Sequence, residues 1–230
     1  MKAGMKYLEL VDGIKRFEYS LWFGEYVYFK ALEMLKEVRA NLDVLDAEKH
    51  VKQIIKMFLI QWGGMRRTID RDGLSWEQLT EQLRNSKEVF QKLRDKSLLD
   101  MNLNNKELAD AIVEAYNSAR VRYVGATAVS KILHLLNPEL FIMWDYVIRE
   151  KYEVTGSARG YLKFLKRVKG EIEEALTEEA AKKGCGTDEV ARTICTELPS
   201  SKLGPEYSRK TLAKLLDEYN WWNAHYSGES

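Results

Sequence analysis

The chain has 230 residues, of which 36 are Lys or Arg and 35 are Asp or Glu, and 45% of its residues are hydrophobic. This length and composition allow a sizeable core, and the near-zero net charge of +1 excludes an acidic or basic tail protein and a uniformly cationic nucleic-acid coat. Three prolines and 14 glycines, against seven Phe, 12 Tyr and six Trp, exclude a low-complexity or disordered chain.

Apolar residues recur at helical spacing along almost the whole chain, and no segment alternates long enough for a strand, so we expect an all-α fold. The first predicted helices span 24–40 and 47–62, and Gly63-Gly64 ends the second. Ser75 is placed to cap a helix that runs to about residue 85, and a short helix follows through about residue 96. Residues 98–105 are predicted as a connector.

Further helices are predicted at 106–120, 128–136, 144–152, 161–176 and 187–197. The helix at 128–136 is the most apolar of the chain, and Pro138 closes it. Residues 198–205 are predicted as a surface loop, after which a last helix at 206–222 has to pack back on the body. We predict one domain over 1–230. The alternative is two helical lobes, about 1–100 with the C-terminal helix 206–222, and about 106–197.

Cys185 and Cys195 are the only two cysteines, which excludes a four-cysteine zinc or iron–sulfur site. Two reduced thiols are expected in an intracellular protein, with a bridge between them as the alternative. No N-terminal stretch has the layout of a signal peptide, and the apolar runs are too short to span a bilayer. We expect a cytoplasmic protein with no membrane partner, metal or cofactor, and the oligomeric state stays open.

The segment 123–145 carries the main functional signal. Gly125 precedes a buried helix whose first backbone amides point outward, as in a phosphate site. Asp145 follows the apolar run Phe141-Ile142-Met143-Trp144 and opens the next helix. A carboxylate that emerges from such an apolar wall is either a helix N-cap or a catalytic group.

Over about 30 residues this segment resembles the helix-hairpin-helix DNA glycosylase superfamily, the endonuclease III and 8-oxoguanine glycosylase group. Val124-Gly125 matches the second glycine of the family's phosphate-binding hairpin, Thr127-Ala128 its Thr-Ala pair, and 141–145 the apolar run that ends in the catalytic Asp. The 17-residue separation of Ala128 from Asp145 also fits the family.

The resemblance implies a compact multi-helix fold of that family and double-stranded DNA with a damaged base as the partner. It implies that Asp145 assists cleavage of the glycosidic bond and that Gly125, Ala126 and Thr127 contact a DNA phosphate. Phe141 and Trp144 would line the pocket for the flipped base.

The chain also departs from the family pattern. Tyr123 stands where the hairpin has its first glycine, so the tight turn must differ. The lysine of the bifunctional members would fall at Ala126 or Thr127, and neither has an amine. Lys131 lies one turn later on the same helix but matches no family motif. The resemblance therefore implies a monofunctional glycosylase, in which Asp145 assists departure of the base and positions or activates water.

Basic residues gather in three clusters despite the near-zero total. The second lies soon after Asp145, where Lys163, Lys166 and Arg167 share one side of a helix and are predicted to bind DNA. The alternative is a solvated face balanced by Glu171, Glu173 and Glu174. The first cluster contains Arg66, Arg67 and Arg71, and the third contains Lys202, Arg209, Lys210 and Lys214.

Two further classes of function stay open beside the glycosylase. One is a non-catalytic DNA-binding protein of the same fold, and the other is an all-α protein–protein interaction module in which Asp145 is only a helix cap.

Two aromatic features have open roles as well. His134 is expected to be a core residue with satisfied hydrogen bonds, and Trp221-Trp222 either packs in the core or stacks on an unpaired base.

Overall fold

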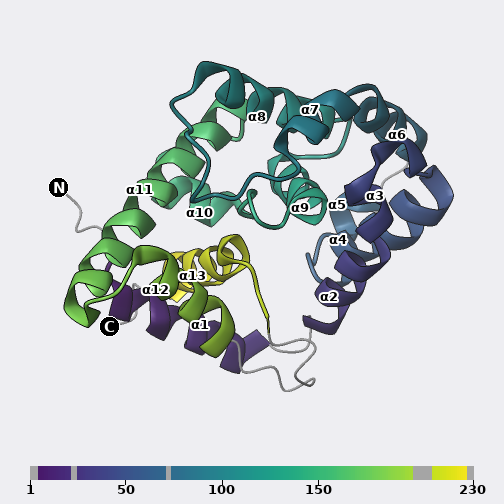
Figure 1. The fold of residues 1–230 in the computed structure, drawn as a ribbon. Coiled ribbons are helices and arrows are strands. Elements are labelled where there is room, and N and C mark those ends of the chain that lie inside the picture. The colour runs from purple at the N-terminus through teal and green to yellow at the C-terminus, as the bar shows by residue number, and fades with distance from the viewer. Residues whose placement is uncertain (1–4, 22–24, 71–73, 199–208, 227–230) are drawn as a thin grey trace.

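The computed structural model describes residues 5–21, 25–70, 74–198 and 209–226, and within these ranges every regular element is a helix (Figure 1). The predicted all-α class is confirmed. None of the described helices is both long enough and apolar enough to cross a bilayer. The elements are α1 (Tyr7–Leu21), α2 (Glu25–Met34), α3 (Lys36–Ala40), the 3₁₀-helix η2 (Leu42–Val44), the π-helix η3 (Ala47–Lys56), α4 (Met57–Gln61), α5 (Arg66–Ile69), α6 (Trp76–Asn85), α7 (Lys87–Leu93), α8 (Lys106–Ser118), α9 (Ala126–Leu136), α10 (Tyr146–Lys151), α11 (Ala158–Lys183), α12 (Thr187–Glu197) and α13 (Leu212–Tyr226).

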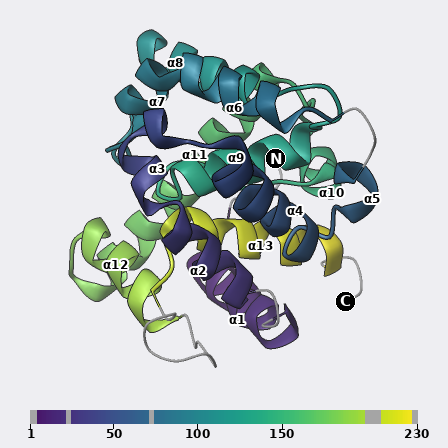
Figure 2. The ribbon, with the colours of Figure 1, turned by 90° about the vertical axis from the view of Figure 1, so that its right-hand side faces the viewer.

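Helix α13 lies between α1 and α10 in both views of the ribbon (Figures 1 and 2). Every residue from Leu212 to Asn220 is buried, which confirms that the last helix packs on the body. It begins at 212 rather than 206, because the Thr211 hydroxyl accepts a hydrogen bond from the Lys214 amide at 3.1 Å and so caps it. Most of the predicted loop at 198–205, and residues 206–208, lie outside the described residues.

Local signals account for several boundaries. The Ser75 hydroxyl accepts a hydrogen bond from the Gln78 amide at 3.0 Å, which confirms the predicted cap of α6. Gly64, with φ +64°, takes the left-handed conformation expected of a glycine turn after α4. The single helix predicted at 24–40 is instead the pair α2 and α3, because the backbone leaves the helical conformation at Leu35 (φ −95°, ψ 8°).

Two helices correct the sequence predictions. Helix α1 is missing from the predicted set because Gly13 in its middle disfavours a helix. That glycine serves packing, since a Cβ there would lie 2.9 Å from a ring carbon of Tyr219. Helix α11 runs over 158–183 instead of 161–176, because the Glu, Ala and Lys residues after 176 favour helix without an apolar stripe. Gly184, with φ +67°, ends it.

Gly160 and Gly170 give a matched pair of tests within α11. Gly160→Ala is expected to lower the free energy of unfolding by ~1–3 kcal/mol, because the new Cβ would lie 2.1 Å from the carbonyl oxygen of Thr155. A Cβ at Gly170 meets nothing within 4 Å, so Gly170→Ala should raise stability by about 0.5–1 kcal/mol through backbone entropy. Urea unfolding of both variants checks this, and equal effects would contradict the close contact at Gly160.

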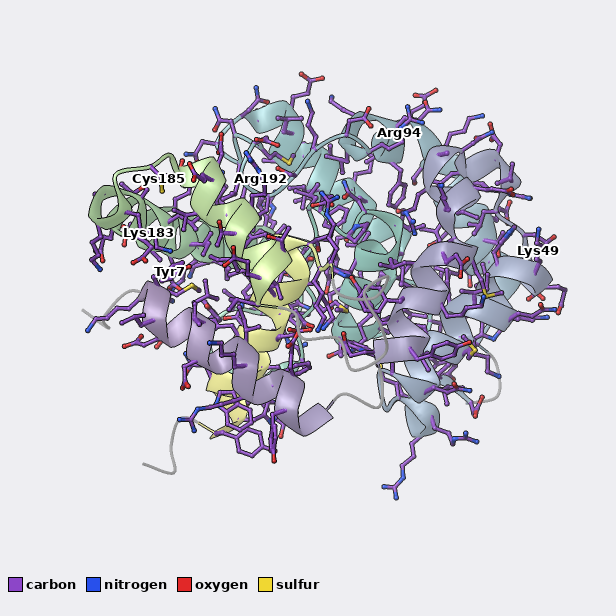
Figure 3. The ribbon with its side chains drawn as sticks, turned by 60° about the horizontal axis from the view of Figure 1, so that its bottom comes forward. Tyr7, Lys49, Arg94, Lys183, Cys185 and Arg192 are labelled. Atoms are coloured by element: carbon purple, nitrogen blue, oxygen red, sulfur yellow. The ribbon has the colours of Figure 1, made fainter. Side chains whose placement is uncertain are left out.

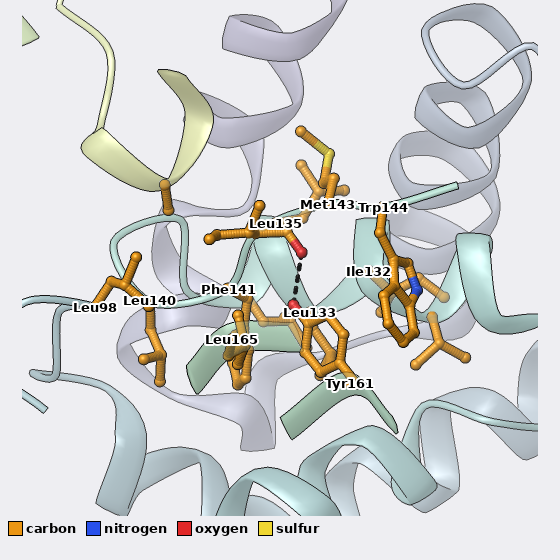
Figure 4. Packing of buried hydrophobic residues seen from close by; sticks show 14 of the residues in the cluster. Leu98, Ile132, Leu133, Leu135, Leu140, Phe141, Met143, Trp144, Tyr161 and Leu165 are labelled. Carbon is orange, nitrogen blue, oxygen red and sulfur yellow. Dashed lines mark hydrogen bonds between the residues drawn. The ribbon is translucent and has the colours of Figure 1, made fainter. Parts of the chain in front are cut away.

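The segment between α9 and α10 is held by buried polar contacts as well as by apolar packing. The Tyr161 hydroxyl donates to the carbonyl of Ile142 at 2.7 Å (Figure 4). The Trp144 ring packs edge-on against Tyr161, with ring centroids 4.9 Å apart. The Asn137 amide donates to the carbonyl of Leu93 at 2.7 Å, which ties this segment to the end of α7. These contacts determine where the chain leaves the core at residue 145.

Cys185 and Cys195 are both free thiols, so the alternative of a bridge between them is not realised. Burial raises the pKa of Cys195 to about 12, which leaves it protonated and unreactive at neutral pH.

Cys185 follows the end of α11, where Lys183 lies 5.2 Å from the ring centre of Tyr7 (Figure 3). This contact joins the end of α11 to the start of α1.

Candidate active site

A cavity of about 440 Å³ opens where α9 and α10 face the end of α4 and α13. Its volume lies within the range of about 300–1,000 Å³ typical of small-molecule sites. Three tryptophans line it, Trp62, Trp144 and Trp221, together with the carboxylates of Glu25, Asp145 and Asp217 and the amine of Lys131. Flat aromatic walls with a few charged groups are suited to a planar heterocycle.

Asp145 lies at the wall of this cavity and also caps α10. Its Oδ1 accepts a hydrogen bond from the Ile148 amide at 2.9 Å. Its Oδ2 lies 2.8 Å from Nε2 of His225, and that imidazole stacks on Trp221 with ring centroids 4.6 Å apart. The side chain is 22% exposed, so the carboxylate remains accessible from the cavity. Asp145 is thus a helix cap whose second oxygen pairs with His225 at the wall of the cavity.

Lys131 comes from α9, which is mostly apolar, and lines the same cavity. Its Nζ lies 4.2 Å from the centre of the Trp62 ring, a cation–π distance. Burial lowers the pKa of Lys131 to about 8, against the opposing attraction of Asp217 and Asp145. The cavity therefore holds an amine that loses its proton more readily than an ordinary lysine.

A buried ion cluster adjoins the cavity through Glu25 and Asp217. Lys214 Nζ, with a fully buried side chain, lies 2.6 Å from Glu218 and 3.6 Å from Oδ2 of Asp217. Lys210 Nζ lies 2.7 Å from the same Glu218 oxygen and 2.8 Å from Glu25. Lys210 and Lys214, two members of the third basic cluster, are therefore enclosed among carboxylates and do not face a partner. Lys202 of that cluster lies outside the described residues.

The carboxylates of the cluster differ in the direction in which their pKa values are shifted. Burial raises the pKa of Asp217 to about 6, although Lys214 and Lys131 oppose the shift. Burial likewise raises the pKa of Glu218. For Glu25, burial acts in the same direction, but Lys214 and Lys210 outweigh it and lower the pKa. Oδ2 of Asp217 is buried and makes no hydrogen bond with the described residues, and Lys214 Nζ lies 3.6 Å from it.

The turn before α9 differs from a glycine hairpin in sequence but takes a glycine-like conformation. Tyr123, which replaces the hairpin's first glycine, adopts φ +70°. Such a conformation costs a non-glycine residue roughly 1–2 kcal/mol. Gly125 is the N-cap of α9, and no side chain caps that helix end. The first amides of α9 therefore receive no side-chain cap of their own.

The structure brings some of the sequence-predicted residues to the cavity and leaves others elsewhere. Asp145, Trp144 and Thr127 line it. Phe141 is fully buried, stacked on Tyr161 with centroids 6.3 Å apart, and does not line the cavity. The remaining predicted DNA-binding residues do not line it either: Gly125, Ala126, Lys163, Lys166 and Arg167. Lys163 and Lys166 are exposed on α11.

Acidic neighbours partly balance the basic side of α11. Arg167 Nε lies 3.3 Å from Glu171, and Lys169 lies 2.7 Å from Glu173. These pairs match the alternative of a charge-balanced surface for Arg167 and Lys169, while Lys163 and Lys166 remain available to a partner.

Six cavity residues have no predicted role, namely Phe17, Glu25, Gln61, Trp62, Lys131 and Asp217. Lys131 had one sequence signal, because it is a cation within the most apolar helix. Trp62 and Glu25 sit at helix ends with no distinguishing pattern. Asp217 lies on the inward face of α13, where a carboxylate is unexpected.

His134 is confirmed as a core histidine with both ring nitrogens engaged. The Tyr28 hydroxyl lies 2.9 Å from Nε2, and Nδ1 lies 2.6 Å from the carbonyl oxygen of Phe141. Because only Nδ1 can donate to that carbonyl, Nε2 accepts from Tyr28 and the ring is neutral. Burial lowers the pKa of His134 to about 3.

This histidine should make the fold acid-sensitive. His134 takes up a proton near pH 6.5 in the unfolded chain but only near pH 3 in the folded chain. The stability that the neutral, buried imidazole contributes is therefore fully present above pH 6.5 and is lost as the pH falls toward 3. Between these pH values we expect the free energy of unfolding to fall with pH in both proteins. The slope of the wild type should be steeper than that of His134→Phe by about 1.4 kcal/mol per pH unit. Urea unfolding from pH 6.5 to 4.5 measures both slopes, and parallel slopes would contradict the assignment.

Comparisons of the chain with protein-family models, curated proteins and solved structures found no significant match.

Proposed function

We propose that this protein is a monofunctional DNA-repair N-glycosylase that binds double-stranded DNA and accepts a flipped, damaged base in the cavity beside Asp145. The observation that carries the proposal is the meeting of Asp145 with three tryptophans in one cavity of about 440 Å³. A flipped base is held by stacking between aromatic side chains and by hydrogen bonds to its edge. Trp62 and Trp221, both half-buried, supply the stacking surfaces. Trp144 is only 1% exposed and supports the wall of the cavity from the core.

Asp145 performs the chemistry in this proposal. When the bond between the base and the sugar breaks, positive charge develops on the sugar, and a fixed carboxylate stabilises it. The capping bond from Ile148 orients the carboxylate, and His225 holds its second oxygen. The same oxygen positions or activates the water that attacks the sugar.

DNA has to reach the cavity across its rim, where Gly63 and Gly64 belong to the lining. Arg66 and Arg67 follow this turn directly, at the start of α5, and both are exposed. We therefore assign phosphate contacts to Arg66 and Arg67, in addition to Lys163 and Lys166 of α11; Arg71 lies outside the described residues. Such contacts make binding local and salt-dependent.

Arg66→Ala is expected to weaken DNA binding evenly across sequences and to lower the slope of log affinity against log salt by about 1. Fluorescence anisotropy with a labelled duplex at several salt concentrations measures both quantities. Lys36→Ala, an exposed site on α3, is the control and should leave the slope unchanged. An unchanged slope in Arg66→Ala would remove this residue from the interface.

The function itself is tested with a panel of duplexes that each carry one damaged base, incubated with the purified protein and then heated in alkali. Alkali-dependent strand breaks at one or more lesions are the expected result. Salt-sensitive binding without breaks at any lesion would replace the proposal with a non-catalytic DNA-binding protein. Absence of both binding and breaks would favour a protein–protein interaction module.

A further inference from the structure

The last turn of α13, residues 221–226, adds no buried residue to the core. Every residue of α13 up to Asn220 is buried, whereas none of residues 221–226 is. Two side chains of this turn belong to the candidate site instead. Trp221 lines the cavity, and His225 lies 2.8 Å from Asp145, which is 80 residues away in sequence. Burial of apolar surface therefore does not explain the position of this turn.

His225 contacts two residues of the cavity wall but is not itself part of the lining. Its Nε2 lies 2.8 Å from Oδ2 of Asp145. Its ring stacks on Trp221, with centroids 4.6 Å apart and an interplanar angle of 27°. Trp221 in turn packs edge-on against Phe17 of α1, with centroids 5.5 Å apart. One imidazole thus connects the carboxylate of the site to one of its aromatic walls.

The direction of the hydrogen bond to Asp145 follows from the chemistry of the two groups. An ionised carboxylate can only accept, so Nε2 of His225 carries the hydrogen and donates it to Oδ2. The Ile148 amide donates to Oδ1 at 2.9 Å. Each oxygen of Asp145 therefore has its own donor, one from α10 and one from α13. The bond from Ile148 alone would leave Oδ2 free to turn, whereas two donors fix the plane of the carboxylate.

We propose that His225 is a positioning residue of the active site, which fixes the Asp145 carboxylate and the Trp221 ring relative to each other. The inference rests on the proposed glycosylase function, and it makes the last turn of α13 part of the site. A base stacked on Trp221 then has its bond to the sugar in a constant geometry beside Asp145. The geometry matters for the rate, because a misplacement of reacting groups by about 1 Å can cost ~10²-fold.

Two variants separate the two contacts of His225. His225→Phe keeps an aromatic ring over Trp221 but removes the donor, and we expect base release to slow by ~10–100-fold. His225→Gln loses the ring but keeps an N–H at the end of a side chain of similar reach, so it should restore most of the rate. Single-turnover base release is measured on the duplex of the lesion panel that the wild type excises best.

Tyr226→Phe, at the next position of the same turn, is the control and should match the wild-type rate. Urea unfolding verifies that each variant folds, and fluorescence anisotropy should show unchanged binding of the duplex. Equal slowing in His225→Gln and His225→Phe would overturn the role of the donor.

A double-mutant cycle shows whether His225 acts through Asp145. In an Asp145→Asn background the charge that His225 positions is gone, so His225→Phe should cause much less further slowing than it does in the wild type. A structural role would lower the rate by the same factor in both backgrounds. That result would overturn the proposal.

The two proposals fail in different ways. If the wild type releases no base from any duplex of the panel, the glycosylase is overturned and this role of His225 with it. If the wild type releases a base and His225→Phe releases it equally fast, only the role of His225 is overturned. Long-range ¹⁵N–¹H spectra of the free protein add a readout that does not depend on activity. Neutral His225 should carry its hydrogen on Nε2, and a hydrogen on Nδ1 would overturn the assignment of the donor.

Discussion

Asp145→Asn is expected to slow release of the damaged base by ~10²–10⁴-fold, the range of a lost acid–base group, with little change in stability. Asparagine caps helices about as well as aspartate, so its side-chain oxygen can still accept from the Ile148 amide. What it removes is the negative charge beside the sugar. The substitution therefore separates the two roles that a sequence alone leaves open for this residue.

The measurement is single-turnover base release on the lesion that the wild type excises best, together with urea unfolding. Asp145→Ala is the matched comparison, because it removes both the charge and the cap and should cost a further ~1 kcal/mol of stability. Full activity in Asp145→Asn would reduce Asp145 to a helix cap. The excision mechanism would then have no catalytic group.

Lys214→Met should have the largest effect on stability of any substitution considered, a loss of ~3–5 kcal/mol. Methionine matches the length of the lysine stem but removes the cation that lies 2.6 Å from Glu218 and 3.6 Å from Asp217. Lys210 still pairs with Glu218 and Glu25, so Asp217 is the carboxylate that loses its nearby cation. Burial alone would lower the pKa of Lys214, yet Glu218 and Glu25 raise it, so the charge is firmly held in the folded state. An uncompensated buried carboxylate is costly even if it then takes up a proton.

Urea unfolding of Lys214→Met against Lys36→Met, an exposed lysine on α3, measures this difference. The surface variant should change stability by no more than ~0.5 kcal/mol. Because whole domains are stable by only ~5–15 kcal/mol, Lys214→Met could leave the chain largely unfolded at 37 °C. A loss below about 1 kcal/mol would show that the cluster compensates by other means.

The buried cluster also bears on the cavity. Glu25 and Asp217 belong to both, so the charges that stabilise α13 also set the electrostatic potential around Lys131. A change in the cluster should therefore shift the pKa of Lys131. This coupling is a reason to measure stability and base release on the same set of variants.

Several local features could be predicted from the sequence because neighbouring residues decide them. Ser75 and Asp145 cap the helices that follow them, and the buried face of α9 follows from its apolar run. Asp145 and Trp144 were predicted as site residues, and both line the cavity. Helix α11 was predicted too short, because helix-favouring polar residues extend it beyond the last apolar contact.

Only the tertiary structure decided which helices pack against one another and which side chains meet between them. A periodic pattern shows which side of a helix turns inward, but it does not say which other helix covers that side. Lys131 meets Trp62, and Asp217 joins the same cavity, only because α9, α4 and α13 pack together. The sequence shows Lys210 and Lys214 as members of a basic cluster but not that they are buried, because burial of a charge depends on distant partners, here Glu25 and Glu218. The sequence by itself thus determined the helices and one carboxylate of the site, whereas packing between distant helices determined the cavity, its amine and the buried ion cluster.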